Sequence, residues 1–141
     1  MRIAWATDEV TAITEAVRAA LVHAGHDVAD LGPGVAWPVA GRVVGEAVAA
    51  ERADAGAVWC WTGTGVAMAA GKVRGVRAAL CVDAETARGA RRWNDANVCA
   101  LSLRLTTVAL AEEILGAFLT TAVESDEAAN IAALEATEVT L

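Results

Sequence analysis

The chain has 141 residues, of which 56% are hydrophobic and 21% are charged. A chain of this size is typical of one domain with one core, and its composition predicts a folded protein rather than a disordered one. The net charge of -7 and the single lysine, Lys72, argue against a nucleic-acid partner, because contacts to phosphate need clustered Lys and Arg. No apolar run reaches membrane-spanning length and the opening MRIAWATDEV has no leader-like stretch, so we expect a cytoplasmic protein without a membrane partner.

The cysteines and histidines give no metal signature. Cys60, Cys81 and Cys99 are widely spaced and odd in number, which favours reduced, buried thiols. No CxxC pair occurs, and His23 and His26 lie far from every cysteine. We therefore expect neither a bound metal nor a cofactor.

Short apolar runs alternate along the chain with longer alanine-rich segments of helical periodicity, which is typical of βαβ units. In chain order we expect a strand over 2–6, a helix over 11–24, a strand over 27–31, a loop over 32–34, a helix over 38–51, a strand over 55–60, a helix after the glycines at 63 and 65, a strand over 78–82, a helix over 83–93, a strand over 98–102, a helix over 107–118 and a last helix over 126–137.

This order predicts an α/β fold, namely a Rossmann-like, three-layer, doubly wound sheet of five parallel strands. We expect a single domain over residues 1–141, in which residues 123–141 form an acidic, helical C-terminal arm. Ligands of such sheets bind beyond the carboxyl ends of the strands. The candidate site segments are therefore those that follow the strands, at 7–9, 60–65, 83 and 102–104.

The stretch WCWTGTGVAMAAGK, residues 59–72, carries the strongest chemical pattern. Its glycines permit backbone conformations in which the N–H groups from Thr62 to Val66 converge on an anion at a helix N-terminus. Beside such a cradle, a Cys60 thiolate could take a proton next to a carbonyl while the amides hold the enediolate oxygen. The alternative is that Cys60 is a small strand residue and the glycines only turn the chain. A dinucleotide fingerprint is excluded, because Met68 occupies the position of its third glycine.

Three segments together resemble the family of ribose-5-phosphate isomerase B and galactose-6-phosphate isomerase. They are WCWTGTGVAMAAGKVRGVRAAL, RRWNDANVCALSLRL and the N-terminal RIAWATDEVTAITEAVRAALVHAGHDVADLG, and they occur in the family's order over nearly the whole chain. The resemblance implies a subunit that forms a homodimer or tetramer, with active sites at the subunit interface. It also implies metal-free aldose–ketose isomerisation of a small sugar or carbonyl substrate.

Carried over position by position, the resemblance assigns roles to individual residues. Cys60 matches the family's proton-abstracting cysteine, and Asp8 matches an aspartate of its N-terminal motif. Asn94 and Asn97 match two asparagines of the family's site. Thr62, Gly63 and Gly65 match the family's anion-hole loop, and we expect the neighbouring Thr64 and Val66 to contact the substrate as well.

Several positions depart from the family pattern. Trp93 replaces the ring-opening histidine, and Glu9 replaces the histidine that follows the aspartate. In ESDEAANIAAL, the family's phosphate-binding arginines align with Glu127, Asn130 and Ile131, so that a positive charge becomes a negative one.

Two more tryptophans, Trp37 and Trp61, align with the mouth of the family's site, where we expect them to narrow the cavity and make it apolar. Equally, they could be space-filling residues of a core or an interface. Together with the altered arm, these departures predict a substrate that is unphosphorylated or otherwise changed.

Three hypotheses follow. The first is an isomerase in which Cys60 is the base and Glu9 replaces the missing acid. The second is a non-catalytic subunit of a heteromeric isomerase, or a small-molecule-binding homologue. The third is an ordinary ribose-5-phosphate isomerase whose phosphate is bound by Arg104 and Arg91.

Some polar residues have two interpretations that the sequence does not separate. Asp8 could orient a substrate hydroxyl or cap the helix that follows. Arg104 is the best candidate to bring positive charge to the cleft, whereas Arg91 and Arg92 suit a solvated helix face. His23 and His26 flank a turn on the side opposite the strand carboxyl ends.

Overall fold

The computed structural model describes residues 1–138 and contains one sheet of five parallel strands. The spatial order of the strands is β2-β1-β3-β5-β4. Their bounds are β1 Arg2–Thr7, β2 Asp27–Pro33, β3 Ala55–Cys60, β4 Ala78–Leu80 and β5 Val98–Ser102. The helices are α1 Ala12–His23, α2 Trp37–Ala49, α3 Thr64–Gly71, α4 Ala84–Asn94, α5 Val108–Thr120 and α6 Ala128–Glu135, with a 3-10 turn η1 Ser125–Glu127 before α6.

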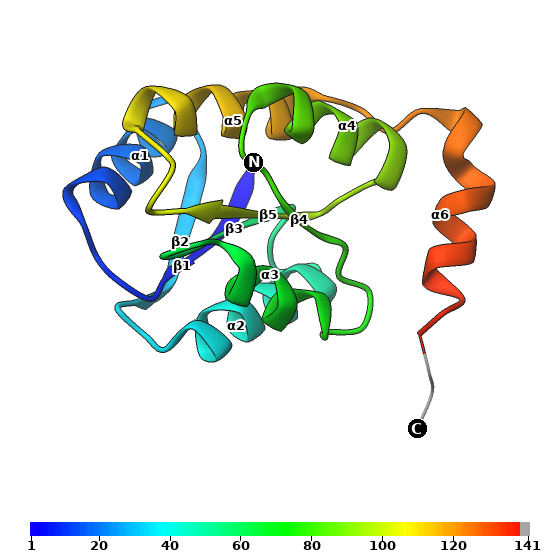
Figure 1. Cartoon of the computed structure of the whole chain (residues 1–141), viewed down its shortest axis with the longest axis horizontal. Helices are drawn as coiled ribbons and strands as arrows, with labels where there is room; N and C mark the ends of the chain where they lie inside the picture. The colour runs from blue at the N-terminus through cyan, green and yellow to red at the C-terminus, as the bar shows by residue number, and fades with distance from the viewer. Residues whose placement is uncertain (139–141) are drawn as a thin grey trace.

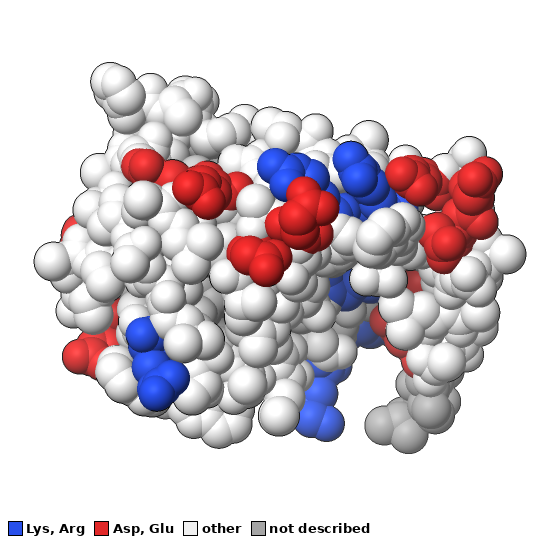
Figure 2. Space-filling model, turned by 45° about the horizontal axis from the view of Figure 1, so that its top comes forward, with Lys and Arg blue, Asp and Glu red and all other residues white. Residues whose placement is uncertain are grey.

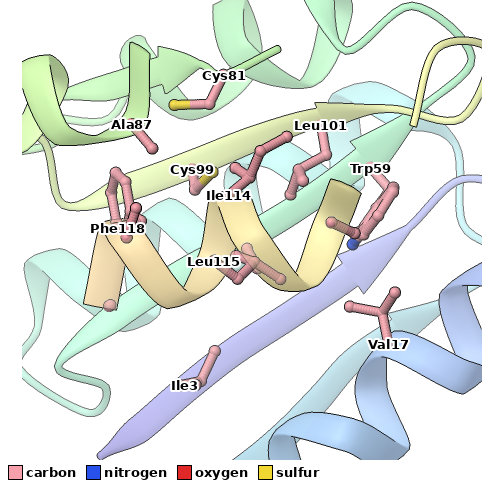
Figure 3. Packing of buried hydrophobic residues seen from close by; sticks show 14 of the residues in the cluster. Ile3, Val17, Trp59, Cys81, Ala87, Cys99, Leu101, Ile114, Leu115 and Phe118 are labelled. Carbon is pink, nitrogen blue, oxygen red and sulfur yellow. The ribbon is translucent and has the colours of Figure 1, made fainter. Parts of the chain in front are cut away.

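The sheet forms the middle of three layers, as the sequence predicts (Figure 1). Helices α1, α4 and α5 cover one face, and α2 and α3 cover the other. Each interface has its own core, and Figure 3 shows the one beneath α5, where Ile114, Leu115 and Phe118 pack onto Leu101 and Cys99 of β5. No helix within residues 1–138 is long and apolar enough to cross a bilayer.

The alternation of side chains along β3 decides which layer each residue meets. Trp59 enters the core beneath α5 and lies against Trp5 of β1, with 5.7 Å between ring centroids. The next residue, Cys60, therefore points to the opposite face and joins the core under α2 and α3. This places the sulfur on the side from which α3 begins.

Some predicted boundaries were wrong. The segment predicted as a loop at 32–34 begins with two strand residues, because β2 is an edge strand and tolerates Pro33 opposite Thr7. Strand β4 ends at Leu80, so Cys81 lies just beyond it and not inside it. The last helix begins with the 3-10 turn, and the end of the predicted arm, residues 139–141, lies outside the described residues.

The amino edge of the sheet, where the strands begin, is held together by polar contacts. Arg2 forms an ion pair with Asp54 in which Nη2 and Oδ1 are 2.8 Å apart. His26 Nδ1 lies 3.3 Å from the N-terminal amine, on the side of the sheet that the sequence predicts. These contacts lie at the end of the sheet that is far from Cys60.

Candidate active site

The candidate site lies where the order of the strands reverses. From β1 the chain crosses to β2 on one side and then returns past β1 to β3 on the other, so β1 and β3 are neighbours at a topological switch point. The helix that follows β1 lies on one face of the sheet and the helix that follows β3 lies on the other. The loops therefore diverge at the carboxyl ends of β1 and β3, which is the position at which folds of this kind bind ligands.

Cys60 is the last residue of β3 and lies at this edge of the sheet. Its side chain is only 5% exposed, because it packs with the core under α2 and α3. Its carbonyl oxygen accepts a hydrogen bond from the N–H of Leu103, at 3.0 Å. The residue is thus held at the carboxyl end of β3, and little of it is open to solvent.

Directly after Cys60 the chain turns through Gly63, whose φ of 76° is strained for residues with a side chain. A Cβ atom there would lie 2.5 Å from Leu80 Cδ1 and 3.0 Å from the carbonyl carbon of Leu101. The turn opens α3, and its first helical hydrogen bond joins the Ala67 N–H to the Gly63 oxygen. The sequence therefore needs glycine here both for the conformation and for the close approach.

The turn leaves backbone amides free at the start of α3. No protein acceptor within residues 1–138 takes a hydrogen bond from the N–H groups of Thr64, Gly65 or Val66. Beside them, the hydroxyl oxygens of Thr62 and Thr64 are 2.7 Å apart and share a hydrogen bond. Free amides at a helix N-terminus favour negative charge, so this loop can receive an anionic oxygen.

Asp8 directly follows β1 at the same edge of the sheet. Its N–H donates to the Trp59 carbonyl at 3.1 Å, which ties the loop to β3. The interpretation of Asp8 as a helix cap is wrong, because Thr11 caps α1 in a reciprocal pair with Thr14. Its Oδ1 atom is buried and has no hydrogen-bond partner among the described residues 1–138. Burial, and then the charge of Glu9, raise the pKa of the Asp8 carboxyl.

Glu9, the residue we expected to replace the missing acid, is exposed. The hydroxyl of Thr7 donates to its backbone carbonyl at 2.6 Å, and its own N–H donates back to that hydroxyl. These two hydrogen bonds fix the backbone of Glu9 against the end of β1.

Two exposed tryptophans stand beside the cysteine loop. Trp61 is 59% exposed, and its carbonyl accepts hydrogen bonds from Ser102 Oγ and from the N–H of Arg104, each at 2.9 Å. Trp37 is 46% exposed, and its indole packs so closely on Gly65 that an added Cβ would lie 2.9 Å from the ring. The loop, both indoles and the exposed residue Arg104 therefore gather at one edge of the sheet.

The other predicted site residues lie at the opposite edge. Asn97 immediately precedes β5, and its carbonyl accepts from Gly56 at the start of β3. Cys60 lies four positions after Gly56 on β3, which is roughly 13 Å along the strand. Trp93 and Asn94 end α4 at the same far edge, and Trp93 is 52% exposed and lies over Gly89 of its own helix. One chain does not bring these residues to Cys60.

Asn97 is also fully engaged. Its Oδ1 accepts from the N–H of Arg77 at 2.8 Å, and its Nδ2 donates to the Gly75 carbonyl at 3.0 Å. Both ends of the amide therefore bind the loop before β4, and Asn97 is committed to holding that loop. By contrast, no partner within residues 1–138 binds the side chain of Asn94, which is exposed.

The expectation that Arg91 lies on a solvated helix face is wrong. Its guanidinium lies over the ring of Phe118 at 5.7 Å and binds Asp95 and the carbonyl of Thr121. Within one chain it is at the edge opposite Arg104, so these two arginines do not form a shared phosphate site. Arg92 is more exposed and pairs with Glu124, with 3.8 Å between Nε and Oε1.

The structure adds a group that sequence reasoning missed, in which Arg77 binds both Asp95 and Glu135. Neither pair follows a helical spacing or a motif, so no sequence signal pointed to it. Residues 1–138 contain no cluster of three His, Cys, Asp or Glu side chains that could hold a metal ion. Cys81 and Cys99 are buried in the core beneath α5, as predicted.

The chain is similar in sequence and in fold to known proteins. The family model of the Ribose/Galactose Isomerase matches residues 3–134. Ribose-5-phosphate isomerase B of Escherichia coli K12 is 35% identical over 123 residues, which cover 84% of this chain and 83% of that protein. Galactose-6-phosphate isomerase subunit LacB of Clostridium acetobutylicum is 43% identical over 83 residues, covering 59% of this chain and about half of its own length, 48%.

A solved structure of ribose-5-phosphate isomerase B from Clostridium thermocellum has a TM-score of 0.91 and 32% sequence identity, and the match covers 96% of each chain. The family match spans β1 through most of α6 and includes the cysteine loop and the Asn94 turn. The chain therefore belongs to the ribose/galactose isomerase family.

Proposed function

We propose that the protein is an aldose–ketose isomerase in which Cys60 moves a proton between neighbouring carbons of an open-chain sugar. The observation that carries this proposal is that Cys60 lies on the α3 side of the sheet, four residues before the unbonded amides of Thr64 to Val66 at the start of that helix. A base and an anion cradle are the two parts that proton abstraction next to a carbonyl requires. The names of the relatives support the same reaction class.

In the proposed reaction, the Cys60 thiolate removes the proton from C2 of the aldose, and the electron pair forms the C1–C2 double bond. The carbonyl oxygen becomes an enediolate oxygen that the free amides stabilise. The proton then returns to C1, while the acid of the site transfers the proton of the C2 hydroxyl to the C1 oxygen; C2 becomes the ketone, C1 carries the new hydroxyl, and no electron leaves the substrate. The helix N-terminus favours the intermediate because its negative charge develops there.

For the acid that moves the hydroxyl proton, the structure favours Asp8 over Glu9. Burial raises the pKa of the Asp8 carboxyl, so it keeps its proton to a higher pH than an exposed aspartate does. Its Oδ1 atom also lacks a protein partner and is therefore available to a ligand hydroxyl. Glu9 stays exposed and supplies negative charge nearby.

We further propose that a second copy of the chain completes the site as a homodimer or a higher oligomer. Trp61 at the carboxyl edge and Met68 on the following helix α3 are exposed, and such apolar side chains suit burial in an interface. At the amino edge, Asn94 and Leu134 line a groove of about 340 Å³ between α6 and the β4 side of the sheet. The groove of one copy would receive the carboxyl edge of the other, which joins Asn94 to Cys60 across the interface.

The substrate is proposed to be a sugar without a phosphate, or with its charge altered. Glu127, Asn130 and Ile131 occupy the positions at which the family resemblance places phosphate-binding arginines. A carboxylate about 4 Å from a phosphate oxygen costs roughly 4 kcal/mol at an effective dielectric constant of 20. That penalty would remove most of the affinity for a sugar phosphate.

A direct test follows deuterium uptake at C2 by NMR in heavy water. The panel pairs free pentoses and hexoses with their 5- and 6-phosphates. We expect uptake with a free sugar and little or none with its phosphate. Efficient turnover of ribose 5-phosphate would contradict the altered substrate but not the isomerase chemistry, whereas no uptake with any sugar would contradict both.

A second candidate is a non-catalytic subunit of a heteromeric isomerase. Two observations favour it: Trp93 stands in place of the family's histidine, and one relative is named as a subunit. In that case the purified chain stays inactive with the whole panel and gains activity when a related chain that carries the histidine is added. Activity of the chain alone would exclude this candidate.

A further inference from the structure

The way in which α6 is attached to the body is unusual for a helix of this composition. None of its residues is buried, although it is rich in alanine and contains Ile131 and Leu134. Figure 1 shows it standing away from the sheet beyond β4. Polar contacts hold it instead: Arg77 Nη1 lies 2.8 Å from Glu135 Oε1, and the Gly75 N–H donates to Glu138 Oε1 at 2.7 Å. Polar contacts, more than apolar packing, therefore set the position of α6.

Arg77 also holds the turn after α4. Its Nε donates to the Asp95 carbonyl at 2.7 Å, and its Nη2 lies 3.1 Å from Asp95 Oδ2. The side chain is 16% exposed, so these contacts are largely shielded from solvent. Asp95 has φ of 47° in the left-handed region, which is uncommon for residues other than glycine and needs support from its surroundings. Arg77 provides part of that support, and Arg91 provides the rest through Asp95 Oδ1.

The backbone of Arg77 is fixed as well. Its N–H donates to Asn97 Oδ1, and its carbonyl accepts from the Asn97 N–H at 2.9 Å. One residue thus links three segments: the strand start at Asn97, the turn at Asp95 and the arm at Glu135. A guanidinium is suited to this task because its planar fork offers several donors in fixed directions, which an ammonium group does not.

We propose that Arg77 is a positioning residue that sets the place of α6 relative to the Asn94–Asn97 turn. In Figure 2, basic and acidic side chains meet in the gap between the body and the arm. The groove of about 340 Å³ has Asn94 on the turn side and Leu134 on the arm side, so the Arg77 contacts fix its width. This inference rests on the proposed function, in which the groove forms one wall of a site shared with a second copy.

Hydrogen–deuterium exchange of the full-length protein tests the link without an activity assay. Glu135→Gln cuts only the arm contact, and we expect about threefold faster exchange in residues 128–138 with no change at 94–98. Arg77→Lys keeps the positive charge but removes the guanidinium group that binds Asp95 and Glu135 at the same time. We therefore expect about tenfold faster exchange in residues 94–98 and 128–138. Arg42→Lys is the matched control, because its exposed pair with Glu46 on α2 touches neither segment.

The kinetic readout separates positioning from a general loss of stability. With the sugar that takes up deuterium, Glu135→Gln should raise KM and leave kcat unchanged, while Arg77→Lys should lower kcat/KM by about tenfold. The inference is overturned if Arg77→Lys leaves exchange at 94–98 and 128–138 unchanged, or raises it equally throughout the sheet. If no sugar reacts, the proposed function fails, and the exchange comparison still decides whether Arg77 links the arm to the turn.

Discussion

The two edges of the sheet differ in how they treat polar groups. At the amino edge, polar side chains are paired across segments: Arg2 binds Asp54, Asn97 binds the loop at Gly75, and Arg77 binds Asp95. At the carboxyl edge, Asp8 Oδ1 has no partner and the first amides of α3 donate to no protein group within residues 1–138. These polar groups of the amino edge are hydrogen-bonded within the chain, whereas those of the carboxyl edge are available to a ligand.

This difference indicates that residues at the amino edge of the sheet mainly stabilise the fold, whereas residues at the carboxyl edge are available for chemistry. Buried polar groups are normally hydrogen-bonded, so the buried and unbonded Asp8 Oδ1, at the same edge as Cys60 and the free amides of α3, points to a position that can bind a ligand. The residues of the Asn94 turn, however, lie on the stabilised edge. They can serve chemistry only if a second copy brings that edge to the open one, and each of the following predictions tests one side of the contrast.

The largest effect is expected at the open edge. Cys60→Ser should lower deuterium uptake at C2 by about 10³-fold, because removal of the base forfeits the contribution of general base catalysis. Cys81→Ala, in the core beneath α5, is the control and should keep its activity. Uptake that survives in Cys60→Ser would show that another group is the base.

The glycine turn should separate strain from packing. Gly63→Ala should destabilise the fold by about 1–3 kcal/mol in urea unfolding, since alanine at φ of 76° is strained and its Cβ meets Leu80 and Leu101. Gly71→Ala, at the other end of α3, places its Cβ in open space and should cost nothing. Equal effects of the two substitutions would contradict the special geometry of the turn.

The two asparagines of the satisfied edge should behave differently. Asn97→Ala should lower stability by about 1–2 kcal/mol, because it leaves the Arg77 N–H and the Gly75 carbonyl without their partner. Asn94→Ala should leave the unfolding curve unchanged and lower only deuterium uptake. A destabilised Asn94→Ala variant would place that side chain among the structural residues.

Two carboxyl groups at opposite edges should respond to pH with opposite signs. The pKa of Asp8 is raised by burial above the ordinary 3.8, so its contribution to stability is complete below that value and is lost as pH rises through its folded pKa. Hydrogen bonds from Arg2 lower the pKa of Asp54 from 3.8 to about 2, so its contribution is present above 3.8 and is lost as pH falls toward 2.

Urea unfolding of Asp8→Asn and Asp54→Asn between pH 2 and 7 measures this contrast. Relative to the unmodified chain, Asp8→Asn should gain stability as pH rises, and Asp54→Asn should lose it. The effects should be small, because Asp54 is exposed and Asp8 is only partly buried. The same sign for both would show that the edges do not differ in charge pairing.

Much of the fold was predictable because buried strands produce continuous apolar runs. Strands β3 and β5 have the predicted bounds, since both are central and enclosed on both faces. The end of β2 was not predictable, because Gly32 and Pro33 indicate a loop unless the strand lies at an edge. Arg91 was misassigned for a related reason, since its partner Phe118 lies on α5, distant in the sequence.

The candidate site was predictable only in part. The cysteine loop is local, so its glycine turn and free amides follow from a short segment. Asn94 and Asn97 look alike in sequence, but only contacts to Gly75 and Arg77, about 20 residues away, give Asn97 its structural role. In the proposed oligomer, a second chain would bring Asn94 to Cys60, and no local sequence pattern indicates such a contact between chains.

The most direct test of the shared site joins the two edges covalently. Trp61→Cys and Asn94→Cys chains are mixed and treated with a short bis-maleimide, and the linked peptides are identified by mass spectrometry. Because positions 61 and 94 lie at opposite edges of one chain, a site shared between copies predicts dimers joined from 61 of one chain to 94 of the other. Protein that remains monomeric, or that links only identical positions, would contradict a site built from two copies.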